Sequence, residues 1–357
     1  MANTFHNLTV SQIDKSTKDC AIISLEVPES LQDTFDYKQG QYLTLKAIIE
    51  NEEVIRSYSL CSSPIDKQWQ IGVKQITDGV FSTWANTTLK PGDQIQAAIP
   101  EGRFYVEVES DAEKHYMAIA AGSGITPVFS IIKTHLKAEP KSRFTLLYTS
   151  KSVDSIILKE DLLFLKNQFM DRLQILFFLT REQRSTELYN GRLDEEKLDE
   201  VFKSIIKLEE VDEFFSCGPE AMTLMVRDYL TQAGVQRKKI HFELFHAEGA
   251  APEIKQDLQL KFEGKHSAIT LIEGGKSIQF SIPVASDNIL DAALKNNTDL
   301  PFACKGGVCC TCRAKIIEGE VKMLVNYALE EEEVAEGYIL TCQALPLSEK
   351  VIVDFDA

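Results

Sequence analysis

The feature that most constrains this chain is a group of four cysteines near its C-terminus. Cys304, Cys309 and Cys312 are separated by four and by two residues, and Cys342 follows after 29 more. A structural zinc site usually takes two short Cys-x2-Cys pairs from separate segments, whereas here one loop supplies three thiols and a distant segment the fourth. The spacing is typical of cysteines that ligate a [2Fe–2S] cluster. We therefore predict an iron–sulfur site rather than a zinc site or a disulfide framework.

The remaining cysteines and the N-terminus favour a reducing compartment. Cys20, Cys61 and Cys217 are scattered singly, and Cys310 in the cluster loop is interpreted as a small packing residue. The N-terminal stretch MANTFHNLTVSQIDKST has no apolar core of the kind that secretory signal peptides carry. No stretch is long and apolar enough to cross a membrane. We therefore expect a cytoplasmic protein, in which thiols stay reduced and clustered cysteines serve metal or redox chemistry.

The chain is strongly acidic, and this charge limits the kinds of partner that it can bind. Its 357 residues carry a net charge of -16, and residues 251–357 alone hold 17 acids against 10 bases. Such a charge argues against a nucleic-acid partner, because a phosphate backbone attracts basic surfaces. The glutamate run at 330–333 is interpreted as a solvated helix face, with a docking patch for a basic electron acceptor as the alternative. A hydrophobic content of 44% is enough for the cores of two or three domains.

The residues around the cysteines predict a small β-grasp domain. AITLIEGGKSIQFSI reads as two alternating strands joined by a Gly-Gly turn, and NILDAALKNN as a short amphipathic helix. RAKIIEGEVKM is expected to be another strand pair, and EKVIVDFDA to close the sheet. Gly306 and Gly307 let the backbone curl closely over a cluster and offer N–H donors to its sulfur atoms. Residues 257–357 resemble a complete plant-type ferredoxin.

A second motif, in the first hundred residues, points to a flavin. VIRSYSLCSSP lies among alternating strands such as QYLTLKAII and WQIGVKQI, and it resembles the Arg-x-Tyr-Ser signature of the ferredoxin-NADP reductase family. The resemblance implies an antiparallel flavin-binding β-barrel over residues 1–108. It also implies that Arg56 pairs with a flavin phosphate, an interaction suited to its forked cationic donors. Tyr58 would stack on the isoalloxazine ring, and the Ser59 hydroxyl would reach the flavin N5 region.

The stretch GVFSTWANTTLKPGD supplies a further anion site in the same part of the chain. A glycine turn leads into a short helix, whose free N–H groups can bind a pyrophosphate. This extra phosphate site favours FAD over FMN. The residues expected to line it are Gly79, Val80, Phe81, Ser82 and Thr83.

The segment HYMAIAAGSGITPVFSIIKTHLKAE begins a second domain, predicted over residues 109–246. An apolar strand, a glycine loop and an amphipathic helix form an anion site, although the third glycine of the Rossmann fingerprint is absent. The loop resembles the Gly-x-Gly-Ile/Val-x-Pro loop of the same reductase family, which lies near the nicotinamide and the pyrophosphate. Strands and helices then alternate, which predicts an α/β domain with a parallel sheet. The expected nucleotide contacts are Gly122, Ser123, Gly124, Thr126 and Pro127.

Two later motifs complete the resemblance at the hydride-transfer site. SCGPEAM matches the family's Cys-Gly-Pro-x-x-Met motif and implies that Cys217, Gly218 and Pro219 lie beside the nicotinamide. HFELF matches the terminal strand, with Glu243 in the position of the family's acidic residue. The resemblance thus implies that Ser59, Cys217 and Glu243 are catalytic. The alternatives are a buried small cysteine at a strand end and a solvated carboxylate.

The loop LTREQRSTELYNGRL bears on the choice of nicotinamide nucleotide. NADP sites place cations and hydroxyls around the 2′-phosphate, whereas NAD sites place an acid on the ribose. Thr180 and Arg181 resemble the family's Ser-Arg pair that binds this phosphate, and Tyr189 would stack on the adenine. Arg184 or Arg192 would add positive charge. The loop favours NADPH over NADH, with a solvated arginine-rich loop as the alternative.

The order of the parts predicts one electron path. NADPH would deliver hydride to FAD, and the [2Fe–2S] cluster would pass electrons on singly; residues 247–256 are expected to be a flexible linker. This order resembles the reductase components of oxygenases, and among them the reductases of phenylacetyl-CoA epoxidases. The resemblance implies a di-iron oxygenase as partner and a role in phenylacetate degradation. The alternatives are a reductase for a Rieske oxygenase, a desaturase or a hybrid-cluster protein, and a redox-sensing electron carrier.

Overall fold

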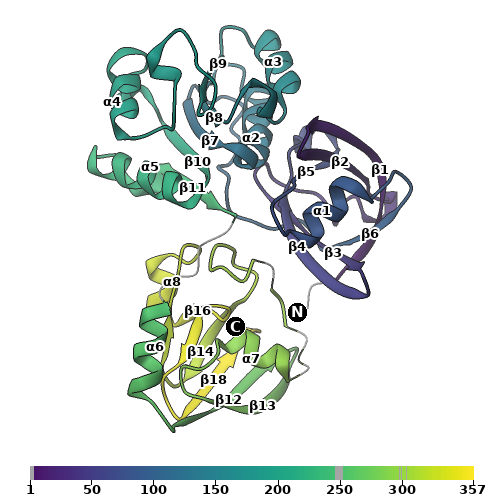
Figure 1. Ribbon diagram of the computed structural model, residues 1–357, viewed down its shortest axis with the longest axis vertical. Helices are drawn as coiled ribbons and strands as arrows, with labels where there is room; N and C mark the ends of the chain where they lie inside the picture. The colour runs from purple at the N-terminus through teal and green to yellow at the C-terminus, as the bar shows by residue number, and fades with distance from the viewer. Residues whose placement is uncertain (1–3, 246–251, 297, 299, 303) are drawn as a thin grey trace. The chain divides into compact units, whose positions relative to one another are not determined.

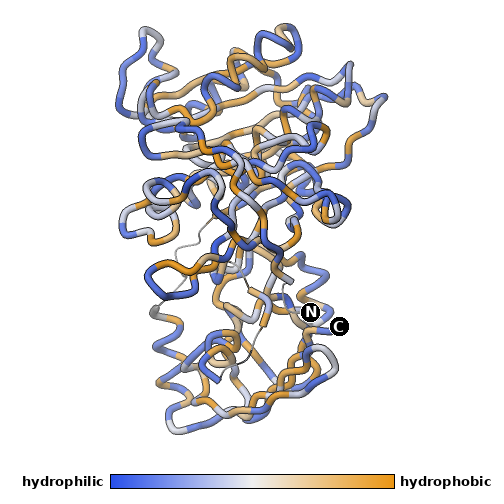
Figure 2. Tube along the Cα trace, turned by 90° about the vertical axis from the view of Figure 1, so that its right-hand side faces the viewer, coloured by the Kyte–Doolittle hydropathy of each residue, from blue (hydrophilic) through white to orange (hydrophobic). Residues whose placement is uncertain are grey.

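The chain forms two compact units in the computed structural model, one of which spans Phe5–Phe245 and the other the C-terminal part (Figure 1). In Figure 2 hydrophobic and hydrophilic stretches alternate along the chain, and several of the outer loops are hydrophilic. Among the described helices, none combines the length and apolar character needed to cross a bilayer. The structure describes residues 4–245, 252–296, 298, 300–302 and 304–357.

Six antiparallel strands make up the first part of the larger unit. In the sheet they follow the order β4-β3-β6-β1-β2-β5. A bridge between Leu60 and Ile71 joins the two edges, so the sheet closes into the predicted barrel. The short helix α1 (Val80–Thr87) covers it with the buried Phe81 and Ala85. The strands are β1 (His6–Thr17), β2 (Cys20–Glu26), β3 (Tyr42–Ile49), β4 (Glu52–Ser59), β5 (Trp69–Lys74) and β6 (Gln94–Ala97).

A parallel five-stranded sheet forms the second part of this unit, as predicted. Its order is β11-β10-β7-β8-β9, so the strand order reverses between β7 and β10. In an open α/β sheet ligands bind at such a switch point, beyond the carboxyl ends of the strands. The strands are β7 (His115–Ala121), β8 (Arg143–Ser150), β9 (Leu173–Leu179), β10 (Glu213–Gly218) and β11 (Ile240–Leu244).

Helices cover both faces of the parallel sheet because its central strand is apolar on both sides. Tyr116 and Ala118 of β7 pack into one core with α2 and α3. Met117 and Ile119 pack into a second core with α4 and α5. A strand buried on both faces reads as a continuous apolar run, as HYMAIAA does. The helices are α2 (Ile125–Ala138), α3 (Lys159–Gln168), α4 (Glu195–Ser204) and α5 (Glu220–Gln232).

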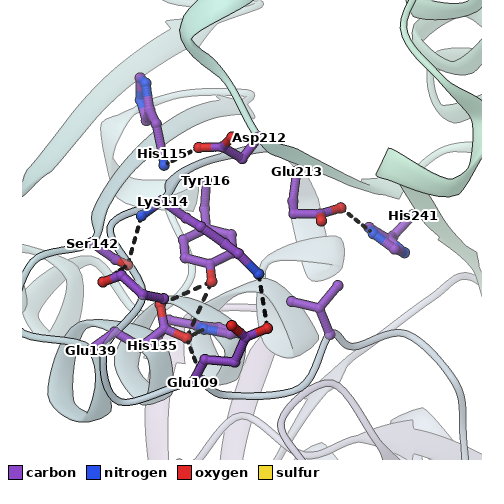
Figure 3. Close-up of polar contacts among 12 residues, drawn as sticks. Glu109, Lys114, His115, Tyr116, His135, Glu139, Ser142, Asp212, Glu213 and His241 are labelled. Carbon is purple, nitrogen blue, oxygen red and sulfur yellow. Dashed lines mark hydrogen bonds and ion pairs between the residues drawn. The ribbon is translucent and has the colours of Figure 1, made fainter.

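A buried hydrogen-bond network lies at the amino ends of β7 and β10 (Figure 3). The Glu139 carboxylate is fully buried and accepts hydrogen bonds from the Tyr116 hydroxyl at 2.9 Å and from His135 Nδ1 at 2.9 Å. The backbone N–H of Glu109 donates to it at 3.1 Å. Burial alone would raise the pKa of Glu139, but His135, the Glu109 N–H and Ser142 outweigh it and lower the pKa from 4.5 to about 2.

This lowered pKa predicts a specific loss of stability in acid. Because the carboxyl of Glu139 binds a proton more readily in the unfolded chain, its contribution is complete above pH 4.5 and is lost as the pH falls toward 2. We expect Glu139→Gln to lower the free energy of unfolding at pH 7 by roughly 3 kcal/mol, and to flatten its decline below pH 4.5. Urea unfolding of the full chain, followed by circular dichroism, measures both effects. The exposed Glu196→Gln is the control, and equal slopes in acid for the two variants would contradict the prediction.

The C-terminal unit is a mixed sheet on which helix α7 packs, as the β-grasp prediction requires. Its order is β13-β12-β18-β14-β16, with β12 and β18 parallel. The predicted hairpin turns at Gly274 and Gly275, whose φ angles of 57° and 71° suit glycine. Helix α7 (Ile289–Lys295) packs on the sheet. The strands are β12 (His266–Glu273), β13 (Lys276–Pro283), β14 (Arg313–Glu318), β16 (Tyr338–Leu340) and β18 (Lys350–Asp354).

The structure corrects or extends three of the sequence-based expectations for this unit. RAKIIEGEVKM forms two strands, but β14 pairs with β16 and β18 while β15 (Val321–Met323) pairs with β17 (Ala344–Pro346). The strand expected to close the sheet, β18, lies between β12 and β14, and its buried Val351 and Val353 pack in the core. The expected linker begins outside the described residues, and its end belongs to helix α6 (Pro252–Lys261). The glutamates at 330–333 open helix α8 (Glu331–Ala335).

Candidate flavin, nicotinamide and iron–sulfur sites

The glycine loop after β7 lies directly against the end of β10. A Cβ atom on Gly124 would come within 2.1 Å of the Cys217 carbonyl oxygen and 2.8 Å of the Gly218 nitrogen. Real side chains never approach backbone that closely, so only glycine fits at this position. The switch point of the sheet is thus formed by two of the predicted nucleotide-binding motifs.

Two helices begin at this switch point and point their free N–H groups toward it. Helix α2 starts after Gly124, and helix α5 starts after Pro219. The loop is held in place by the Thr126 hydroxyl, which donates to the Ser123 carbonyl at 2.9 Å, and by the Tyr148 hydroxyl, which donates to the Gly122 carbonyl at 2.9 Å. Helix N-termini and glycine backbones of this kind bind the phosphates of dinucleotides.

The three residues predicted to be catalytic come together beside this loop. The parallel register of β10 and β11 pairs Cys217 with Glu243. Ser59, at the end of barrel strand β4, donates a hydrogen bond from Oγ to Glu243 Oε2 at 3.0 Å. Ser59 and Cys217 are buried, at 4% and 0% exposed. Burial and the nearby Glu243 carboxylate raise the pKa of the Cys217 thiol, which therefore stays neutral.

The barrel presents an aromatic surface near the same strand end. Tyr58 is half-buried and packs on Phe81 with ring centroids 5.3 Å apart, and Phe81 packs in turn on Trp84. Burial raises the pKa of the Tyr58 hydroxyl, which stays protonated. Arg56 lies exposed on β4 with Nη1 donating to the Ile55 carbonyl at 2.7 Å. An exposed cation beside a half-buried ring matches what a flavin phosphate and an isoalloxazine ring need.

In the predicted pyrophosphate loop, backbone groups rather than side chains are available to bind a ligand. Helix α1 begins after Gly79, where a Cβ would come within 2.5 Å of the Ile76 side chain. Phe81 is 1% exposed, and the Ser82 hydroxyl donates to the Gly79 carbonyl at 3.2 Å. Val80 is 49% exposed. The accessible binding groups here are therefore the N–H groups of the first helical turn.

The predicted 2′-phosphate loop lies at the carboxyl ends of β8 and β9. The backbone N–H groups of Thr180 and Arg181 donate to the carbonyls of Ser150 and Lys151 at the end of β8, which fixes the loop beside the sheet. The Arg181 side chain is exposed. Tyr189 is half-buried, its ring edge-on to Phe178, and the Arg184 guanidinium lies 5.9 Å from its ring centroid. An aromatic ring thus stands beside exposed cations, as an adenosine 2′-phosphate would require.

The four predicted ligand cysteines are brought together as two pairs of thiols. Cys304 lies next to Cys309, and Cys312 next to Cys342, close enough for the two thiols of each pair to influence each other's pKa. The Gly306 N–H donates to the Cys304 sulfur at 3.3 Å. The Cys309 thiol and three backbone N–H groups lower the pKa of Cys304 to about 6. All eight cysteines are free thiols.

Residues on either side of Cys342 attach its segment to the cluster loop. Both the N–H and the hydroxyl of Thr341 donate to the Cys312 carbonyl, the hydroxyl at 3.0 Å. The Gln343 side chain donates to the Lys305 carbonyl at 2.8 Å. The Cys310 sulfur instead lies 3.4 Å from the Ala328 carbonyl, consistent with the packing role expected for it.

This arrangement fits a dinuclear cluster better than a single metal ion. Among the described residues, no three histidine, cysteine, aspartate or glutamate side chains converge on one ion site. Two cysteine pairs match a [2Fe–2S] cluster, in which each iron takes two protein ligands. The donor set and its N–H···S contacts therefore fit the cluster that the spacing predicts.

Sequence reasoning missed several residues that build these sites. Gly72 of β5 leaves room for the Thr126 methyl, which a Cβ would meet at 2.5 Å. Thr341 and Gln343 hold the fourth cysteine, and Tyr148 holds the glycine loop. Their only signal in the sequence is proximity to a motif, because each acts through a partner far along the chain.

Three family models match successive parts of the chain. The model for the oxidoreductase FAD-binding domain matches residues 7–105, and that for the oxidoreductase NAD-binding domain matches residues 118–228. The model for the 2Fe-2S iron-sulfur cluster binding domain matches residues 271–347. The three matches follow the order of the barrel, the parallel sheet and the β-grasp unit.

Relatives match over nearly the whole chain. A component of the 1,2-phenylacetyl-CoA epoxidase from Escherichia coli K12 is 40% identical over 354 residues, which cover 99% of this chain and 98% of the relative. The ferredoxin reductase component of 3-ketosteroid-9-alpha-monooxygenase from Rhodococcus rhodochrous is 31% identical, over 98% and 96%. The solved structure of phthalate dioxygenase reductase shares the fold, with a TM-score of 0.63 at 22% identity over 98% of both chains.

These matches agree with the switch-point geometry and with the paired cysteines, and they confirm the class of oxidoreductase that the motifs predicted. FAD, a nicotinamide nucleotide and a [2Fe–2S] cluster are the cofactors of its three domains. The chain belongs to the ferredoxin-NADP reductase superfamily, among the reductase components of oxygenases that carry a C-terminal plant-type [2Fe–2S] domain.

Proposed function

We propose that this protein takes hydride from NADPH and passes the electrons singly to a di-iron oxygenase that epoxidises phenylacetyl-CoA. The observation that carries the reductase part is the contact of Ser59 with Glu243, next to Cys217, where the barrel meets the parallel sheet. The acceptor is proposed from the 40% identity to the epoxidase component of Escherichia coli. When bound, FAD would accept hydride and release single electrons, which the [2Fe–2S] cluster would carry onward.

The three residues at the junction would act by position and by protonation state. The Ser59 hydroxyl is a neutral donor whose orientation is set by Glu243. The neutral Cys217 thiol offers a small, weakly polar surface against which a nicotinamide ring can lie. The burial of Ser59 and Cys217 keeps water away from their side of the site, which strengthens each polar contact made there.

The remaining site residues are proposed binders. We assign the cluster to Cys304, Cys309, Cys312 and Cys342, and the FAD phosphates and ring to Arg56, Tyr58 and the α1 N-terminus. The nicotinamide nucleotide is assigned to the two loops at the switch point. Its residues are Gly122, Ser123, Gly124, Thr126, Pro127, Cys217, Gly218 and Pro219, with Thr180, Arg181 and Tyr189 for the adenosine end.

The nucleotide preference leads to a prediction on Arg181. We expect Arg181→Ala to raise the KM for NADPH by about 10- to 100-fold, the loss of one charge-assisted contact, and to leave the KM for NADH nearly unchanged. Steady-state flavin reduction with both nucleotides measures this. Lys141→Ala is the control, because Lys141 is exposed and precedes β8, so it lies at the amino ends of the strands and the 2′-phosphate loop at their carboxyl ends. Equal effects of Arg181→Ala on the two nucleotides would refute the 2′-phosphate assignment.

An anaerobic stopped-flow experiment tests the proposed function as a whole. Flavin and cluster bleaching are followed separately with NADPH and with NADH, and then in the presence of a di-iron epoxidase or a Rieske oxygenase. We expect flavin reduction to precede cluster reduction, to be faster with NADPH, and the cluster to be reoxidised by the di-iron enzyme. A cluster that stays oxidised while the flavin bleaches would contradict the electron path. Reoxidation by the Rieske enzyme alone would contradict the proposed acceptor.

A further inference from the structure

Helix α2 contacts the barrel through buried hydroxyl groups. Ser130 donates from Oγ to the Ser62 carbonyl at 2.5 Å, and the hydroxyls of Thr134 and Ser63 lie 2.8 Å apart. All four residues are at most 2% exposed. Ser130 and Thr134 are four residues apart, so they lie on one face of the helix. We call these two contacts the hydroxyl seam.

Charged contacts hold the same barrel segment at its other end. Lys133 of α2 forms an ion pair with Asp66 at 2.7 Å, and Lys137 also binds Asp66. Burial alone would raise the pKa of Asp66, but the two ammonium groups outweigh it and lower this pKa. The second half of helix α2 thus contacts residues 62–66 of the barrel through hydrogen bonds and ion pairs.

This segment and this helix each carry part of the proposed hydride-transfer site. Residues 62–66 follow shortly after Ser59 in the chain. The segment is rigid within the barrel, because the Ser62 hydroxyl is bonded to the Tyr37 hydroxyl at 2.7 Å and to the Gln68 carbonyl at 2.6 Å. At its other end, α2 begins at the glycine loop beside Cys217. A helix of 14 residues is about 21 Å long and bends little.

We propose that the hydroxyl seam is a positioning device, which sets where the nicotinamide loop lies relative to Ser59. This inference rests on the proposed hydride transfer. An apolar contact would tolerate sliding, whereas paired hydroxyls hold one register because hydrogen bonds are directional. A shift of about 1 Å between hydride donor and acceptor is enough to slow a reaction about 100-fold. Ser130 and Thr134 would therefore act through the loop, without touching nucleotide or flavin.

The test removes the Thr134–Ser63 contact from each side. In Thr134→Val the shape is kept and the hydroxyl is lost. Ser63→Ala removes the same contact from the barrel side, together with the long cap that the Ser63 hydroxyl accepts from the Ile65 N–H at 3.4 Å. We expect either variant to slow flavin bleaching at saturating NADPH by about 10- to 100-fold, while flavin content and the Kd for NADP⁺ stay within about threefold of wild type. The double variant should be no slower than the slower single variant, because both remove one contact. Thr134→Ser should restore the rate.

A matched control exists on another helix. Thr231 of α5 is exposed and donates to the Arg227 carbonyl at 2.8 Å, as Thr134 donates to the Ser130 carbonyl at 2.7 Å. Thr231→Val thus removes the same local contact without a barrel partner and should leave the rate unchanged. Bleaching rates within about twofold of wild type in both Thr134→Val and Ser63→Ala would overturn the proposal, and so would fully additive losses. Wild-type protein that no nicotinamide nucleotide reduces would instead refute the proposed function.

Discussion

Cys342→Ser is expected to abolish the iron–sulfur cluster while the flavin stays bound. The Cys342 thiol pairs with Cys312, and its neighbours Thr341 and Gln343 hold this segment against the cluster loop. Removing an outer-shell partner of a metal site costs roughly 10- to 100-fold in affinity, so loss of a ligand itself should cost more. Iron and acid-labile sulfide should fall close to zero. NADPH should still bleach the flavin, but electron delivery to a one-electron acceptor that depends on the cluster should stop.

Cys310→Ser is the matched control for this experiment. Cys310 lies in the same loop, between two proposed ligands, but its sulfur contacts the Ala328 carbonyl. A serine hydroxyl can donate to the same carbonyl, so cluster content should stay near the wild-type value. The reverse outcome, in which Cys342→Ser keeps its iron and Cys310→Ser loses it, would mean that the fourth ligand has been misassigned.

Gly124→Ala is expected to damage hydride transfer more than any conservative change outside the cluster. The new methyl group would meet backbone atoms of Cys217 and Gly218 at 2.1–2.8 Å, so either the loop or the end of β10 must move. Overpacking of this kind costs about 1–3 kcal/mol of stability. A displacement of about 1 Å at the reacting atoms costs about 100-fold in rate. Stopped-flow flavin bleaching and thermal unfolding of the full chain measure the two effects.

Gly234→Ala separates this steric effect from the general cost of replacing a glycine. Gly234 has a φ of 87°, and no atom lies within 4 Å of where its Cβ would be. We expect Gly234→Ala to lower the free energy of unfolding by about 1 kcal/mol through backbone strain, with no change in the rate of flavin bleaching. If the flavin of Gly124→Ala bleached as fast as that of wild type, the loop would accommodate the added methyl group. That outcome would contradict the close packing described above.

Much of the fold follows from short patterns because those patterns report local physics. Alternating apolar residues predicted the barrel strands, and the Gly-Gly pair predicted the hairpin turn at Gly274 and Gly275. The cysteine spacing predicted the cluster type because four thiolates must reach two irons from one loop and one distant segment. The apolar run before Gly122 predicted a strand, and the alternation of strands and helices after it predicted a parallel sheet. Apart from the distant Cys342, a residue's nearest neighbours in the chain were enough in each case.

The pairing of distant segments was decided only by tertiary structure. Periodicity indicated that β14, β15 and β18 are strands, but the shared core placed β15 in a second sheet and β18 between β12 and β14. Motifs named Ser59 and Glu243 separately, and their hydrogen bond joins residues 184 positions apart. No local sequence pattern predicted the hydroxyl seam, or the hydrogen bonds of Thr341 and Gln343 that position Cys342. Such contacts form only when the cost of closing long loops is offset by packing of the whole domain, so no short stretch of sequence encodes them.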